Sequence, residues 1–120
     1  MAHFAVVGPA YFSHFNALEA IAVELIERGH RVTFLHRIDA RSFLRDPRIG
    51  FHVLGRQSHP AGSLAESLRR AANPGGPLGI RAVIADMART TDMLCRDLPA
   101  AMQQLGIDAM LDQLLAQGAA

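Results

Sequence analysis

Residues 3–36 read HFAVVGPAYFSHFNALEAIAVELIERGHRVTFLH, and this stretch is enough to predict the fold class. Residues 3–7 form a short apolar run closed by a glycine and a proline, which is typical of a buried parallel strand. Over residues 14–28 the apolar side chains recur at helical spacing, and a glycine follows as a stop signal. Residues 31–36 repeat the strand pattern. The stretch therefore predicts a strand–helix–strand unit whose two strands are parallel.

The rest of the chain continues the alternation of strands and helices. Asp39 is placed to cap a short helix over residues 40–45, and the glycine-containing polar residues 55–62 are predicted to form a loop. The other predicted elements are a strand over 50–54, a helix over 63–72, a turn at 73–77, a long helix over 80–105 that Pro99 kinks or restarts, and a strand over 107–111. We therefore expect an α/β protein with an open parallel, Rossmann-like sheet and helices on both faces.

Composition and charge exclude several classes of protein. Twelve basic and eleven acidic residues leave a net charge of +1, so no strong field favours a nucleic-acid partner. All twelve basic residues are arginine, which excludes a Walker lysine and Schiff-base chemistry. The single Cys95 excludes an internal disulfide and a multi-cysteine metal site, and no histidine pair has the spacing of zinc ligands. We therefore expect no metal and no cofactor.

The same sequence carries no targeting signal in the residues given. No apolar run approaches the roughly 18 residues of a membrane span, and the first residues lack the basic region of a secretory signal. We expect a soluble domain in a reducing compartment.

Candidate functional residues lie where strands end, because parallel sheets bind ligands outside the carboxyl ends of their strands. His14 lies where the first loop enters the first helix, and the helix dipole there favours a neutral, basic imidazole. Asp112 follows the fourth strand. If the first and fourth strands are neighbours, His14 and Asp112 form a dyad in which His14 is the general base and the Asp112 carboxylate orients its imidazole. The simpler alternatives are that His14 is a partly exposed loop residue and that Asp112 caps the next helix.

The first loop also invites a nucleotide-binding interpretation. A dinucleotide fingerprint requires glycines at three set positions, whereas Gly8 is followed by a proline, an alanine and the bulky Tyr11 and Phe12. His36 and Arg37, at the end of the second strand, are suited to receive the 2′-phosphate of NADP. An NADP- or other nucleotide-binding module without glycosyl transfer is therefore the alternative function.

Several segments of the sequence match a known family. The segment AVVGP at residues 5–9, the pair Ser13 and His14, and RGHRVTF at residues 28–34 resemble the N-terminal half of UDP-dependent glycosyltransferases of the GT-B architecture. Further segments are similar to the bacterial zeaxanthin glucosyltransferases of carotenoid biosynthesis, and these are SHPAG at 58–62, ARTTDMLCR at 88–96 and DQ at 112–113. The resemblance covers essentially all 120 residues.

This resemblance implies that residues 1–120 are the N-terminal, acceptor-binding domain of a longer enzyme whose C-terminal domain binds the donor. Such enzymes move glucose from UDP-glucose to a hydroxyl of a lipophilic acceptor such as zeaxanthin, with inversion at the anomeric carbon. The catalytic base of the family matches His14, and its orienting aspartate matches Asp112. The chain alone is expected to be inactive. The resemblance also implies a cytoplasmic location, with peripheral association at the inner membrane face as an alternative.

One departure from the family pattern concerns the loop before His14. Many relatives carry a run of glycines there, whereas this chain has two aromatic residues. We therefore expect the loop to face an apolar acceptor rather than the donor phosphate, with Tyr11, Phe12 and Phe15 as wall residues and His59 as a further substrate-binding residue. Three arginines, Arg69, Arg70 and Arg81, flank the turn at 73–77 and are candidates for contact with anionic lipid, although a solvated face is the simpler explanation.

Overall fold

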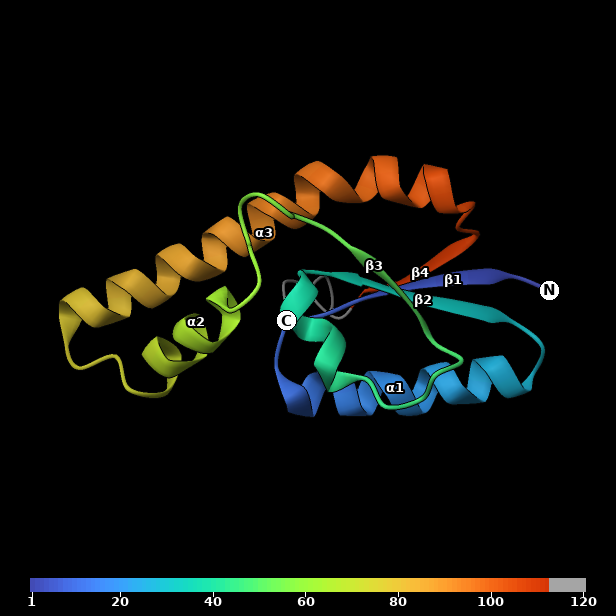
Figure 1. Cartoon of the computed structure of the whole chain (residues 1–120), viewed down its shortest axis with the longest axis horizontal. Coiled ribbons are helices and arrows are strands. Elements are labelled where there is room, and N and C mark those ends of the chain that lie inside the picture. Colours follow the sequence, from blue (N-terminus) through green and yellow to red (C-terminus); the bar gives the residue numbers. More distant parts are fainter. Residues whose placement is uncertain (113–120) are drawn as a thin grey trace.

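The computed structural model describes residues 1–112, and it shows a single parallel sheet with helices on both faces (Figure 1). The strands, β1 (His3–Val7), β2 (Arg31–His36), β3 (Gly50–Val53) and β4 (Ala109–Asp112), lie in the order β3-β2-β1-β4, and every neighbouring pair is parallel. The helices are α1 (Phe12–Glu27), α2 (Ser63–Ala72), α3 (Pro77–Leu105) and a short 3₁₀ helix, η1 (Ile38–Phe43). The predicted α/β class and the open, Rossmann-like parallel sheet are confirmed.

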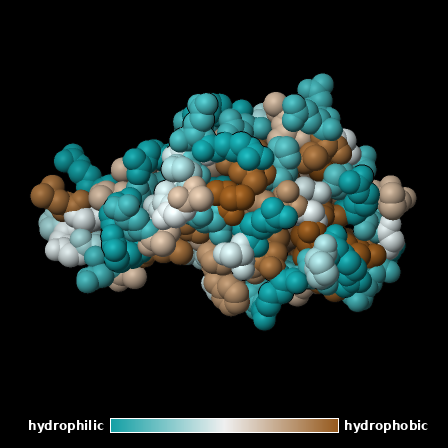
Figure 2. All heavy atoms as spheres, in the orientation of Figure 1, coloured by the Kyte–Doolittle hydropathy of each residue, from teal (hydrophilic) through white to brown (hydrophobic). Residues whose placement is uncertain are grey.

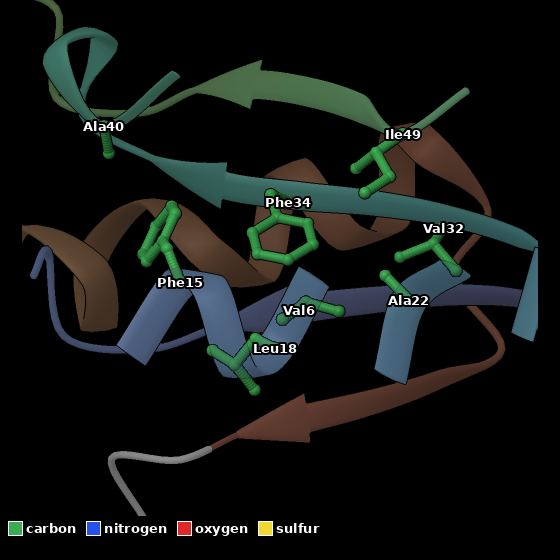
Figure 3. Packing of buried hydrophobic residues seen from close by; sticks show 8 residues of the cluster. All are labelled: Val6, Phe15, Leu18, Ala22, Val32, Phe34, Ala40 and Ile49. Atoms are coloured by element: carbon green, nitrogen blue, oxygen red, sulfur yellow. The ribbon is translucent and has the colours of Figure 1, made fainter. Parts of the chain in front are cut away.

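The hydrophobic core is divided between the two faces of the sheet because successive strand residues point to opposite sides. Val6 of β1 and Phe34 of β2 face α1, where Phe15 packs 5.3 Å from Phe34, measured between ring centroids (Figure 3). On the other face, Val7 and Leu35 belong to a second buried cluster that includes residues from the C-terminal half of α3. The members of that second cluster are Ala5, Val7, Leu35, Leu54, Met93, Leu94 and Ala101.

Two local details differ from the sequence-based expectations. The segment after β2 is a 3₁₀ helix that begins at Ile38, so Asp39 lies inside it and does not cap it. The long helix begins earlier than expected, at Pro77, because proline is well suited to the first turn of a helix. As predicted, the helix extends to Leu105, and Gly106, with a φ of +67°, ends it. It does not restart at Pro99, and Figure 1 shows that it bends along its length.

The α2–α3 pair extends beyond the sheet (Figure 1). Arg70 of α2 joins the two helices by donating through Nε and Nη2 to the carboxylate of Asp86 on α3, at 2.9 Å each. Such a two-pronged contact fixes orientation as well as distance. The N-terminal half of α3 therefore forms a two-helix arm with α2, while its C-terminal half packs on the sheet. None of the described helices is both long enough and apolar enough to cross a bilayer.

A hydrogen-bonded junction attaches β4 to β1. The His3 backbone N–H donates to Asp108 Oδ2 at 2.8 Å, and the Asp108 N–H donates to the His3 carbonyl at 2.9 Å. The buried His3 ring also contacts Thr33 Oγ1 at 2.7 Å and the Leu105 carbonyl at 3.0 Å. This junction sets the register in which Val7 pairs with Asp112, so the ends of β1 and β4 lie at one edge of the sheet.

Candidate functional site

A pocket of about 160 Å³ lies between the loops at the carboxyl ends of β1 and β2 and the α2–α3 pair. Its walls are mostly apolar, and they include Gly8, Pro9, Ala10, Tyr11, His14, His36, Arg37, Leu64, Ser67, Leu68, Ala71, Val83, Asp86, Met87, Thr90, Thr91 and Leu94. An apolar cavity of about 150 Å³ holds a molecule of the size of benzene. The pocket therefore accommodates one ring-sized apolar group.

His14 lies in the wall of this pocket. It is the third residue of α1, so its side chain lies in the first helical turn, and it is half-buried. Its ring centroid is 5.9 Å from that of Tyr11, which lines the pocket as well. The pocket thus brings together two histidines, His14 and His36, one phenol and a largely apolar surface that also includes Arg37 and Asp86. Such a site suits an apolar molecule that carries a hydroxyl group.

The predicted partner of His14 ends the neighbouring strand. Asp112 is the last residue of β4 and pairs with Val7, one residue before the loop that leads to His14. The first and fourth strands are therefore neighbours, which was the condition for the proposed dyad. The structure describes the backbone of Asp112 and not its side chain, so the His14–Asp112 dyad stays a prediction.

His36 contributes a buried, neutral imidazole to the pocket wall. Its Nδ1 accepts a hydrogen bond from the Arg37 backbone N–H at 2.8 Å, so the ring proton of the neutral form is on Nε2. Burial lowers the pKa of His36 from 6.5 to about 4, and the positive charge of Arg37 acts in the same direction, while the nearby Gly8 carbonyl opposes them. Within the described residues, Nε2 has no hydrogen-bond partner of normal geometry.

Arg37 is a buried cation beside His36. Only 4% of it is exposed, and its Nη2 donates to Ser63 Oγ at 2.6 Å, which joins the end of β2 to the start of α2. Burial lowers the pKa of Arg37, and the more distant carboxylates of Asp39 and Asp86 oppose that shift. Arg37 also lines the pocket, and its buried Nε has no hydrogen-bond partner among the described residues. The nucleotide-binding alternative stays a prediction.

Two of the three aromatic residues predicted as wall residues lie elsewhere. Phe15 is 1% exposed and belongs to the core between α1 and the sheet, because the helix turns it away from the loop (Figure 3). Phe12 is 53% exposed but lies outside the pocket, where it packs edge-on against Phe43 and beneath the guanidinium of Arg45. Of the three, only Tyr11 lines the pocket.

His59 is also displaced from the pocket. It is buried, its Nδ1 is 2.8 Å from Ser58 Oγ, and its Nε2 is 3.4 Å from Oγ1 of the pocket residue Thr90. Burial and the positive charges of Arg37 and Arg89 lower the pKa of His59. His59 therefore lies behind the pocket wall and supports it, instead of touching the space where a ligand would bind.

The apolar wall that the helices supply was not predicted from sequence. Leu64 and Leu68 of α2 and Val83 and Met87 of α3 line the pocket. An apolar stripe on a helix is ordinarily explained by core packing, so the sequence alone does not mark these residues as pocket walls. The length of the predicted helix over residues 80–105 was the signal that could have revealed this wall. A helix of that length extends beyond the sheet, so the apolar side chains of its N-terminal half must pack against something other than the sheet. Among residues 1–112, no three His, Cys, Asp or Glu residues cluster closely enough to hold a metal ion.

Known proteins resemble this chain over nearly its whole length. A protein named zeaxanthin glucosyltransferase from Pantoea ananas is 47% identical over 120 residues, which cover 99% of this chain. A protein of the same name from Pseudescherichia vulneris is 38% identical over 112 residues, or 92% of this chain. The chain is a homologue of zeaxanthin glucosyltransferases. No family model and no solved structure matches it.

The chain corresponds to 28% and 25% of the lengths of these two zeaxanthin glucosyltransferases. The similarity to the Pantoea ananas protein includes nearly every residue, so the pocket lies within the segment that the homologues share.

Proposed function

We propose that this chain is the acceptor-binding part of a glycosyltransferase that moves glucose from UDP-glucose to a hydroxyl group of a lipophilic acceptor such as zeaxanthin. The observation that carries the proposal is the pocket, in which a half-buried His14 lies among apolar walls. The names of the two relatives support the same chemistry. A C-terminal domain, outside this chain, binds most of the donor.

In the proposed reaction, His14 acts as the general base. Its imidazole takes the proton of the acceptor hydroxyl as the oxygen attacks the anomeric carbon of glucose. The bond from that carbon to the diphosphate oxygen breaks, and UDP leaves with the electron pair. Attack from the face opposite the leaving group inverts the anomeric configuration. Asp112 orients the ring and stabilises the imidazolium that forms. Neither metal nor cofactor takes part in these steps.

The size of the pocket limits how an acceptor binds. A volume of about 160 Å³ accommodates one ring, so a long polyene acceptor places its hydroxylated end ring beside His14 and leaves the remainder outside. An acceptor of this kind is dissolved in a membrane, so we propose that the enzyme works from the cytoplasm in peripheral contact with the membrane.

A chimeric enzyme tests this function. This chain replaces the matching 120 residues of the Pantoea ananas relative, and the formation of zeaxanthin glucoside from UDP-glucose is measured. We expect transfer by the chimera and its loss in a His14→Ala version that still folds and still binds zeaxanthin. A folded chimera that binds both substrates and transfers no glucose would contradict the proposal.

A further inference from the structure

The N-terminal half of α3 carries large apolar side chains that no described residue covers. Leu78, Ile80, Ile84 and Met87 are 80%, 51%, 61% and 56% exposed. The last three are spaced by four and three residues, so they share one face of the helix, and we call these three residues the apolar strip. Leu78 lies on another side of the same helix, near its start. Figure 2 shows hydrophobic atoms at the far left end of the molecule, where α3 begins. Exposed apolar side chains that gather on one face mark an interaction surface.

The apolar strip is continuous with the pocket. Met87 belongs to both, and Val83 and Leu94, on the adjoining side of the same helix, line the pocket. Met87 therefore links the pocket to the exposed Ile84 and Ile80. Exposed apolar surface of this kind is unfavourable in water and favourable against lipid.

Two arginines without carboxylate partners flank the turn between α2 and α3. Arg69, in the last turn of α2, and Arg81, in the first turns of α3, are exposed, and neither side chain forms an ion pair or a hydrogen bond with a described residue. Arg70 and Arg89, by contrast, both bind Asp86. The end of the two-helix arm thus combines uncompensated positive charge with exposed aliphatic side chains. This is the composition of surfaces that bind anionic lipid headgroups and insert into the region beneath them.

We propose that the α2–α3 arm docks on an anionic lipid bilayer through the apolar strip, Arg69 and Arg81, with the mouth of the pocket turned toward the lipid. The strip inserts at the level of the headgroups, and the two guanidinium groups contact lipid phosphates. The purpose of this docking, which is to admit a membrane-dissolved acceptor directly from the bilayer, rests on the proposed function. The docking itself requires no sugar transfer.

Vesicle co-sedimentation of the 120-residue chain tests the docking. One set of vesicles contains phosphatidylcholine alone, and the other contains equal parts of phosphatidylcholine and phosphatidylglycerol. We expect binding to the anionic vesicles that weakens as salt is added. The double variant Ile80→Ser/Ile84→Ser is expected to bind at least about tenfold more weakly, because two aliphatic side chains no longer leave water. The double variant Arg69→Gln/Arg81→Gln is expected to reduce binding to the level seen with phosphatidylcholine.

Ile21→Ser is the matched control, because Ile21 is 47% exposed on α1, away from the arm. Circular dichroism and thermal melts confirm that each variant is folded. Equal binding by the wild-type chain and the strip variant would overturn the proposal, as would an equal loss in Ile21→Ser. A wild-type chain that ignores both vesicles but forms dimers that the strip variant abolishes would also overturn it, since the strip would then join two copies. If the chain binds anionic vesicles as expected but the chimera transfers no glucose, the result would contradict the proposed function and leave the docking proposal intact.

Discussion

Asp39 caps a helix that begins far along the chain from it, because its Oδ2 accepts a hydrogen bond from the Leu64 backbone N–H at 2.9 Å. The same carboxylate accepts the Gly62 N–H at 2.9 and 3.0 Å. Gly62 precedes α2 with a φ of +90° and has no side chain with which to cap it. The turn after β2 therefore positions α2, and with it one wall of the pocket.

We predict that Asp39→Ala destabilises the protein by about 1–2 kcal/mol, because the start of α2 loses its acceptor. Asp39→Asn keeps an acceptor oxygen and is expected to cost less. The free energy of unfolding in urea measures both effects. Asp92→Ala is the control, since the ion pair of Asp92 with Arg96 is exposed and is expected to change stability by at most about 0.5 kcal/mol.

A second prediction concerns Glu19, a buried carboxylate on α1. Its Oε2 accepts the backbone N–H groups of Arg45 and Asp46 at 2.7 and 2.9 Å, so it holds the segment that leads into β3. Glu19→Ala is expected to lower the free energy of unfolding by about 2 kcal/mol or more, because two donors lose their partner. Glu24→Ala, which removes an exposed i,i+4 pair with Arg28, should cost no more than about 0.5 kcal/mol. Similar losses in the two variants would show that the Glu19 contacts contribute little.

The buried His36 makes stability depend on pH. Its pKa is about 4 in the folded protein and 6.5 when it is solvated, so the unfolded chain takes up a proton first as the solution is acidified. The contribution of a neutral His36 to stability is complete above pH 6.5 and is expected to be lost between pH 6.5 and pH 4, which amounts to about 3 kcal/mol at most. Urea unfolding at several pH values measures the slope. His36→Gln, which does not titrate, should flatten it, and an unchanged slope would assign the effect to other groups.

The fourth prediction tests whether His14 and Asp112 act together. In the chimera, His14→Ala is expected to lower turnover by about 10²–10⁴-fold with little change in acceptor binding. Asp112→Asn should also be damaging, because an amide favours the wrong tautomer of the ring, as it does in serine-protease triads. The double variant should be scarcely worse than His14→Ala. Losses that multiply would show that the two residues work separately, with Asp112 then serving as a helix cap.

The sequence predicted the sheet well because each strand is a short apolar run that a turn signal closes. It also placed His14 and Tyr11 at the right edge, since the residues after β1 must lie there in any parallel sheet. It failed where a role depends on tertiary contact. Phe12 and Phe15 are both aromatic residues at the start of α1. Only the packing of this helix decides that Phe15 lies in the core and Phe12 is exposed to solvent. Asp39 caps a distant helix, which no local pattern can reveal.

The order of the strands also has a consequence for synthesis. β1 can pair with β2 soon after both leave the ribosome, but its other edge stays unpaired until β4 has been synthesised. The hydrogen bond that joins His3 to Asp108, next to β4, links residues 105 positions apart in the sequence. At roughly 5–20 residues per second, several seconds separate the two pairings. During that interval the nascent chain presents an unpaired edge of an apolar strand, which is a template for aggregation. Slower elongation lengthens this exposure, so the yield of folded protein should depend on chaperones that bind extended apolar segments.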